Sequence, residues 1–143
     1  MLLYKLGSWF YRKKIPVMDR VCDVLIRIFH NCAVYSQTQI GSGTIFGYGG
    51  IGVVIHKRAI IGKDCVIGSN VTIGGRSKSL EVPKIGDGVY IATGAKILGH
   101  VNVGDNSVIG ANAVVLNDIP ANCVVAGVPA VVKKSNINAR DFF

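Results

Sequence analysis

Hydrophobic residues recur with a period of six from residue 34 to near the end of the chain. Written in sixes, the sequence gives units such as IGKDCV, IGSNVT, IATGAK, VGDNSV and IGANAV. An aliphatic residue, once Phe46, opens every unit, and a small or turn-compatible residue usually follows it. A six-residue period with these preferences predicts the hexapeptide repeats of a parallel β-helix.

The repeats predict a triangular coil. Three six-residue sides make one turn of roughly eighteen residues, and the aliphatic residue of each side points inward. The units after residue 34 make about four turns. Glycine or asparagine after the inward residue is expected to supply the positive φ of a tight corner. The inward residues should stack in columns that form the core, namely Ile61, Ile67, Ile73, Ile91, Ile97, Val103, Ile109 and Val115.

The six-residue period is interrupted between residues 46 and 62. This segment, FGYGGIGVVIHKRAIIG, is three residues longer than the repeat requires. A second interruption forms a predicted loop at 74–84. The first break carries Tyr48, which we expect to be exposed, and His56, which follows the inward Ile55 and should face outward from a corner. We expect these two loops, with or without a neighbouring subunit, to build the acceptor pocket.

The first 32 residues follow another pattern. Pro16 separates a short aromatic and basic stretch from a segment whose apolar residues recur at helical spacing. These residues are Val17, Val21, Val24, Leu25 and Ile28. The sequence therefore predicts an amphipathic helical segment at 1–32, a β-helix domain at 33–132 and a basic C-terminal tail at 133–143. Two interpretations of the helical segment stay open: it packs on the domain or a neighbouring subunit, or it is a basic peripheral anchor on a membrane.

Composition narrows the function classes. With 143 residues, the chain is one domain. The net charge of +8 is concentrated at the two ends, and no aromatic and basic platform for nucleic acid is visible. Four cysteines without a C-x-x-C pair, and a start interrupted by basic residues, predict reduced thiols in a cytoplasmic protein. The histidines and cysteines show no metal-ligand spacing, so no metal is expected.

Three blocks of sequence carry a family resemblance: G-A-K-I-L-G, I-G-A-N-A-V-V and A-G-V-P-A. Together with V-T-I-G-G at 71–75, they resemble the hexapeptide-repeat acyltransferases, in particular the serine acetyltransferase branch. The resemblance implies an all-β fold, a left-handed parallel β-helix, and an enzyme that uses acetyl-CoA as co-substrate. Because a single prism leaves outer faces uncovered, a homotrimer is the expected assembly.

The resemblance also assigns the coenzyme A side of the site. Gly74 and Gly75 correspond to the family's glycines after a coil strand, and Thr93 and Ala111 to the positions that line the pantetheine. Lys133 and Lys134 are predicted partners of the CoA phosphates, because lysine serves as a flexible phosphate-binding charge. The alternative interpretation is that the first four are only corners of the coil and that the two lysines belong to a solvated tail.

The family's acid-base groups are missing. Its acidic residue and catalytic histidine fall on Gly47 and Tyr48, its aspartate on Ala33, and a further histidine on Val82. Transfer to a hydroxyl requires a general base, for which histidine fits best. We therefore predict His56 as the base and Tyr48 as a group that orients the substrate. His30 is interpreted as structural, on its helix, and His100 as a turn residue.

The resemblance and the missing acid-base groups leave three functions open. The G-Y-G pattern and the short N-terminal segment resemble bacterial acetyltransferases of capsule, exopolysaccharide and O-antigen assembly. The leading hypothesis is thus O-acetylation of a sugar hydroxyl in cell-surface polysaccharide biosynthesis, in the cytoplasm or at the inner face of its membrane. The alternative is a serine O-acetyltransferase of cysteine biosynthesis. A non-catalytic β-helix scaffold is the second alternative.

Overall fold

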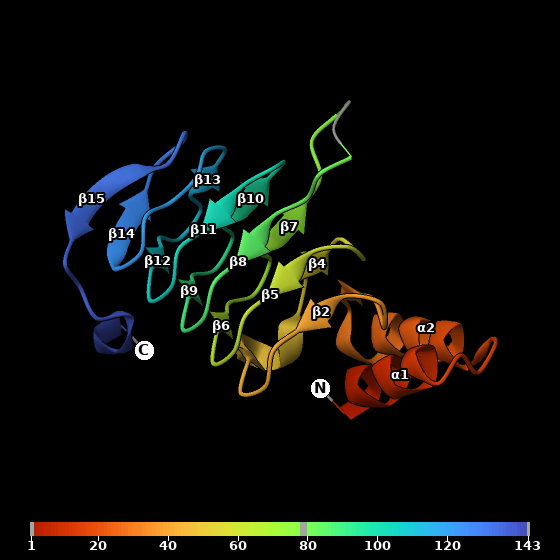
Figure 1. Ribbon diagram of the computed structural model, residues 1–143. Coiled ribbons are helices and arrows are strands. Elements are labelled where there is room, and N and C mark those ends of the chain that lie inside the picture. The colour runs from red at the N-terminus through yellow and green to blue at the C-terminus, as the bar shows by residue number, and fades with distance from the viewer. Residues whose placement is uncertain (1, 78–79, 143) are drawn as a thin grey trace.

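The computed structural model describes residues 2–77 and 80–142, and it has two helices, α1 (Leu2–Arg12) and α2 (Met18–His30), followed by a coil of short strands (Figure 1). Sheet A contains β1 (Ala33–Val34), β4 (Val54–Ile55), β7 (Thr72–Gly74), β10 (Lys96–Leu98) and β13 (Val114–Val115). Sheet B contains β2 (Gln39–Ile40), β5 (Ile60–Ile61), β8 (Lys84–Ile85) and β11 (Asn102–Val103). Sheet C contains β3 (Ile45–Phe46), β6 (Val66–Ile67), β9 (Tyr90–Ile91), β12 (Val108–Ile109), β14 (Cys123–Ala126) and β15 (Val131–Ser135).

From β1 to β13, successive strands belong to sheets A, B and C in turn, so the three sheets are the three faces of a left-handed parallel β-helix of about four turns. From β1 to β10, each strand pairs in parallel with the strand three positions further along the chain, as Ile55 does with Ile73 and Ile73 with Ile97. A parallel ladder of this kind satisfies the backbone groups of each turn with those of the next. The predicted fold class and turn number are confirmed.

The core runs along the axis of the coil. All eight residues predicted to point inward are at most 3% exposed. Small residues fill the space beside them, including Ala59, Ala95, Ala113 and Cys65, none of which is exposed. All four cysteines are free and buried, and burial raises the pKa of the Cys65 thiol.

The glycines after the inward residues serve a purpose other than the predicted one. The backbone of Gly62 does not lie in the positive φ region, which is occupied two residues further on by Asp64 with a φ of 53°. Gly62 is needed because it lies directly against Gly86 of the next turn: a Cβ there would be 2.6 Å from the Gly86 carbonyl carbon. The expectation about φ was therefore wrong at this position, and close approach of successive turns explains the glycine.

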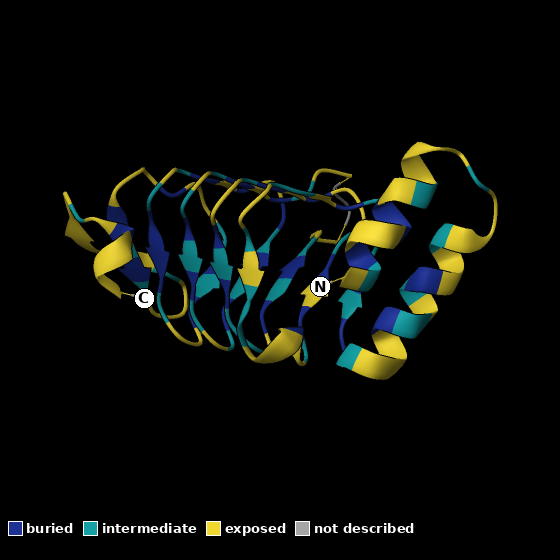
Figure 2. Cartoon of the chain, turned by 90° about the horizontal axis from the view of Figure 1, so that it is seen from below, coloured by how far each residue is buried: buried dark blue, intermediate teal, exposed yellow. Residues whose placement is uncertain are grey.

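The two helices lie side by side at one end of the coil, opposite the C-terminus (Figure 2). The residues of α2 that pack inward are Cys22 and Ile26, whereas Val24 and Ile28 of the predicted apolar stripe are 57% and 67% exposed. The hydrogen bonds of the Asp23 carboxylate set this orientation. Its Oδ1 accepts from Ser36 N at 2.7 Å and from Ser36 Oγ at 2.6 Å. The predicted helix is present, but most of its apolar stripe faces outward.

The end of the chain is more ordered than the predicted tail at 133–143. β15 pairs antiparallel with β14, so that Lys134 lies beside Val124. A short 3₁₀ helix, η2 (Ala139–Phe142), follows, and Ala139 N donates to Asn106 Oδ1 at 2.8 Å. Of the described residues, none forms a helix long and apolar enough to cross a bilayer.

Candidate functional site

The interruption of the six-residue period lies at the corner between sheets C and A, which we call the C–A edge. Seven residues, 47–53, connect β3 with β4, whereas four residues, 68–71, connect β6 with β7 in the next turn. The predicted three extra residues therefore lie here. They form the 3₁₀ turn η1 (Gly47–Gly50), in which Tyr48 has a φ of 50° and is 81% exposed.

Two of the predicted CoA residues lie on the same C–A edge, further along the coil. Thr93 and Ala111 occupy successive turns and are both exposed. Backbone hydrogen bonds connect the levels, with Asn112 N donating to Thr93 O at 3.0 Å and Gly94 N to Ser69 O at 2.9 Å. The C–A edge is thus a line of small residues, of which Thr93 and Ala111 are exposed and Ser69 is half-buried, and it ends at the loop of Tyr48.

His56 lies on the other border of sheet A, which we call the A–B edge. Its backbone N donates to Ile73 O at 2.8 Å, which places His56 beside Gly74. A Cβ on Gly74 would meet nothing closer than 3.9 Å, so there is open space at this glycine and at the exposed Gly75 that follows. The structure therefore brings His56 together with Gly74 and Gly75.

The surroundings of His56 favour the neutral form of its imidazole. Partial burial, and then the cations of Arg58 and Lys57, lower the pKa of its imidazole. Its Nδ1 accepts a hydrogen bond from Arg58 N at 3.2 Å. A neutral imidazole that accepts at one nitrogen carries its proton on the other, so Nε2 of His56 is a donor in this arrangement.

The predicted site residues do not form one cluster. Tyr48 and His56 lie on different edges of sheet A, before and after β4. Lys133 and Lys134 lie on the exposed β15, at the end of the coil opposite the helices (Figure 1). His100, predicted as a turn residue, holds the second loop: its Nδ1 lies 2.8 Å from Glu81 Oε2. Residues 78–79 of the predicted loop 74–84 lie outside the described residues.

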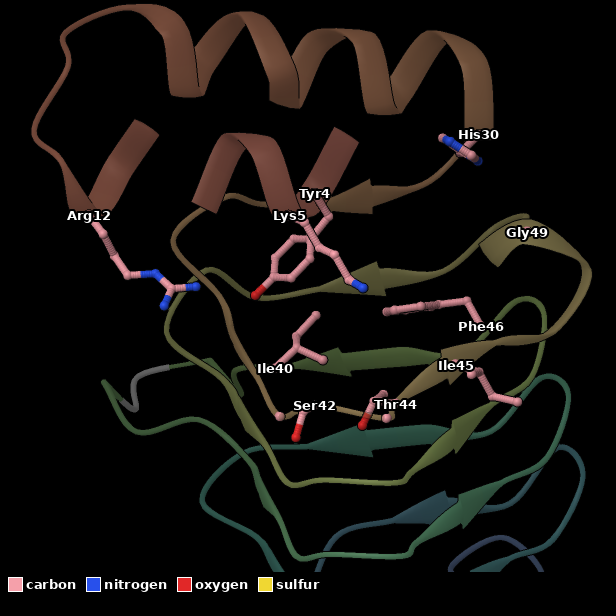
Figure 3. Close-up of a pocket in the computed structure, with 12 residues that line it drawn as sticks. Tyr4, Lys5, Arg12, His30, Ile40, Ser42, Thr44, Ile45, Phe46 and Gly49 are labelled. Carbon is pink, nitrogen blue, oxygen red and sulfur yellow. The ribbon is translucent and has the colours of Figure 1, made fainter. Parts of the chain in front are cut away.

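A cleft of about 770 Å³ lies between α1 and the first turn of the coil, next to η1. Figure 3 shows Lys5 projecting into it, with Arg12 and His30 at its two ends and Phe46 on its floor. Sequence reasoning missed this cleft and treated His30 as structural. The one available signal was that His30 ends its helix just before the coil begins, close in sequence to the first corner. No group of three or more His, Cys, Asp or Glu side chains within 2–77 and 80–142 is placed to hold a metal ion.

Comparison with known proteins agrees with the coil. The family model described as "Bacterial transferase hexapeptide (six repeats)" matches residues 83–117. A serine acetyltransferase of Synechococcus elongatus is 35% identical over 140 residues, which are 96% of this chain and 57% of the relative. One of Staphylococcus xylosus is 38% identical over 128 residues, covering 88% of this chain and 59% of the relative. The chain therefore spans somewhat more than half the length of the curated relatives it matches.

Solved structures give the same result. A serine acetyltransferase from Brucella abortus strain S19 in complex with coenzyme A matches with a TM-score of 0.90 at 32% identity, over 96% of this chain and 55% of that one. A serine acetyltransferase in complex with cysteine matches with a TM-score of 0.86 at 32% identity, over 93% of this chain and 52% of that one.

These findings overturn the leading functional hypothesis. The homologues and structural neighbours are serine acetyltransferases, and nothing among them supports the polysaccharide branch or a place at the inner face of a membrane. The short N-terminal segment and the G-Y-G pattern, which favoured that branch, are local features, whereas the match to serine acetyltransferases covers nearly the whole chain. The chain is therefore similar to hexapeptide-repeat transferases over residues 83–117 and to serine acetyltransferases over most of its own length.

Proposed function

We propose that this protein is an acetyl-CoA-dependent acetyltransferase whose acceptor is the hydroxyl of serine. The observation that carries the proposal is the match over 96% of the chain to a serine acetyltransferase in complex with coenzyme A. This acceptor was the alternative in the sequence interpretation, and the comparisons favour it over a sugar. The absent acid-base residues at Ala33, Tyr48 and Val82 require that a different side chain takes the proton.

The coenzyme side of the proposal rests on small residues at exposed edges. At Thr93 and Ala111 an extended pantetheine arm can approach the backbone closely and form hydrogen bonds with main-chain groups. Gly74 and Gly75 offer open space on the neighbouring edge. Lys133 and Lys134 are held in a strand, and their ammonium groups are available to the CoA phosphates.

Two further features belong to the proposal. Large apolar side chains on the outer faces of the coil, such as Ile45 at 58% and Val54 at 45% exposure, favour association into the predicted homotrimer. The four buried free thiols fit a reducing compartment, as expected of a cytoplasmic enzyme. Sedimentation equilibrium of the purified protein tests the assembly, and a monomer at micromolar concentration would contradict it.

The activity is tested by the release of free thiol from acetyl-CoA with L-serine as acceptor. L-Alanine, which lacks only the hydroxyl, is the control acceptor. We expect release that depends on L-serine and not on L-alanine. The absence of serine-dependent release would overturn the proposal, and calorimetric titration with acetyl-CoA would then show whether the chain is the non-catalytic scaffold considered above, because a scaffold has no reason to bind the cofactor.

The prediction that His56 is the base has its own test. His56→Ala should lower kcat by about 10²- to 10⁴-fold if His56 takes the proton. The hydrogen bond from Arg58 N weighs against this role, because Nε2 already carries a proton in the arrangement described.

A further inference from the structure

The cleft between α1 and the first turn of the coil is positively charged. Its lining contains the cations Lys5 and Arg12 together with His30, and the described residues that line it include no carboxylate, although the carboxylate of Asp64 lies beside Gly43 of this lining. Hydroxyl groups of Ser42 and Thr44 lie along the opposite wall (Figure 3). A cleft with this balance of charge is complementary to a small anion that also carries polar groups.

The cations differ in their availability. Arg12 donates to Ser8, from Nη2 to Oγ at 3.1 Å and from Nε to the backbone oxygen at 3.4 Å. Tyr4 between them donates its hydroxyl hydrogen to Thr38 O at 2.6 Å. For the ammonium of Lys5, the described part of the chain offers no hydrogen bond or ion pair. Lys5 is therefore the cation whose charge is free for a ligand.

His30 faces the cleft from the other end. It is half-buried and also lines a second cavity of about 390 Å³, which it shares with Tyr48 and Gly49. Gly49, with a φ of 70°, has no side chain to cover the ring: a Cβ there would lie 3.9 Å from His30 Nδ1. Asn31 O accepts a hydrogen bond from Gly52 N at 2.9 Å, which ties the end of α2 to the loop. His30 is thus held beside the extra residues of the C–A edge.

This position also relates His30 to the coenzyme. Gly47 lies at the level of Gly68, one turn below, and the β3–β6–β9 ladder places Ala92 and Thr93 one turn further. At about 4.8 Å for each turn, the loop of Tyr48 is about 10 Å from the level of Thr93 along the same edge. A pantetheine arm that follows the C–A edge therefore leads toward His30. His56 lies across sheet A on the other edge.

We propose that this cleft is the acceptor site, in which Lys5 binds the carboxylate of a hydroxy-amino acid and His30 is the catalytic base. This inference rests on the proposed acetyl transfer. One ring nitrogen of His30 takes the hydroxyl proton as the oxygen forms a bond to the thioester carbonyl carbon. The carbon–sulfur bond then breaks, and the leaving CoA sulfur receives that proton, so that neutral imidazole and the acetyl ester remain.

The role of His30 is tested in the thiol-release assay with L-serine. His30→Ala should lower kcat by about 10²- to 10⁴-fold, and added imidazole should restore part of it. Arg27→Ala, which removes an exposed cation of the same helix that does not line the cleft, is the control and should keep the activity of the parent protein. Full activity of His30→Ala, or a loss confined to His56→Ala, would overturn the assignment.

The role of Lys5 is tested by changing the acceptor. Lys5→Gln should raise KM for L-serine by about 5- to 10-fold and leave KM for L-serinamide, which has no carboxylate, nearly unchanged. Lys13→Gln removes an exposed cation of the same segment that does not line the cleft, and it should change neither constant. An equal effect of Lys5→Gln on both acceptors would refute carboxylate binding.

A measurement without turnover separates this inference from the proposed function. L-Serine is titrated into the full chain while the three histidine Cε1–H signals are followed by NMR, each assigned from its alanine variant. We expect the His30 signal to shift, and to need more L-serine in Lys5→Gln. If saturating L-serine leaves that signal in place, the cleft is not the acceptor site, whether or not the protein releases thiol.

Discussion

Gly62 lies where two turns of the coil approach most closely, and its replacement by alanine should destabilise the fold. The new Cβ would overlap the carbonyl oxygen of Gly86 and lie 2.6 Å from the carbonyl carbon. Carbon atoms in contact are normally at least about 3.5 Å apart, so the two turns would have to separate by about 0.9 Å. The Cβ would also overlap Oδ1 of the Asp87 side chain, which can move, but the two Gly86 atoms belong to the backbone and cannot rotate away.

That separation acts along the coil axis, which is also the direction of the hydrogen bond from Gly62 N to Ile85 O. This bond, 2.9 Å long, would stretch to about 3.8 Å, beyond the range of hydrogen bonding. Its loss costs about 0.5–1.5 kcal/mol. Overpacking adds about 1–3 kcal/mol. We therefore expect Gly62→Ala to lower the free energy of unfolding by about 1.5–4.5 kcal/mol, which corresponds to a fall in Tm of about 5–20 °C.

The matched control is Gly74→Ala, where the added Cβ meets nothing within 3.9 Å. Its free energy of unfolding should stay within about 1 kcal/mol of the parent value. Both variants are followed by denaturant unfolding at one fixed protein concentration, because association alters apparent stability. If Gly62→Ala unfolds like Gly74→Ala, the explanation of this glycine by close approach is wrong. The control also tests a ligand site, since Gly74→Ala should weaken acetyl-CoA in calorimetric titration if pantetheine passes this position.

Two other predictions concern single side chains. Burial, together with Arg58, should hold the pKa of His56 below that of an unperturbed histidine in an NMR titration, and Arg58→Ala should bring part of it back. Because the folded state then binds fewer protons than the unfolded one, the contribution of His56 to stability is present above about pH 6.5 and is lost as the pH falls through the folded pKa. His56→Gln is the matching control: this part of the pH dependence should be absent in it, and the same pH dependence in both proteins would contradict the lowered pKa. Asp23→Ala removes the acceptor of the backbone N–H of Ser36, a residue that is 1% exposed, and should cost about 1–3 kcal/mol in thermal unfolding, while Ser36 Oγ keeps the backbone oxygen of Asp19 as acceptor. Asp19→Ala, on the same helix, should cost less than about 1 kcal/mol, and equal losses would contradict the role of the Asp23 hydrogen bonds.

The coil could be predicted because its cause is local and repeated. Each six-residue unit buries one aliphatic side chain, so aliphatic residues recur every six positions in the sequence. A single substitution does not obscure this period, because the other units still show it. Ile73 and Ile97 could be assigned to the same column from their spacing alone, and the register confirms it. The three extra residues at 47–53 were found in the same way, as a departure from the period.

The orientation of α2 could not be predicted in this way. Helical spacing identifies an apolar stripe, but it does not say whether the stripe faces the chain itself or something outside it. Here the orientation of α2 is set by two short hydrogen bonds from Ser36 to Asp23, and Ser36 is 13 residues away in the sequence. Such a pair has no period and no motif, so it becomes visible only once the coil and the helix are placed together.

The site shows the same limit, with a consequence for function. The sequence predicts His56 as the base inside the coil, because this histidine lies within ten residues of the interruption in the six-residue period. The structure separates this histidine from the extra residues by the width of sheet A, and α2 instead delivers His30 to the loop of Tyr48. A change at one position of the coil can therefore be offset by a residue from an element outside the repeat. The corners of the coil stack in columns. When a catalytic residue is missing from one corner, its replacement is therefore to be sought among all side chains that reach the same column of corners, whatever their place in the sequence.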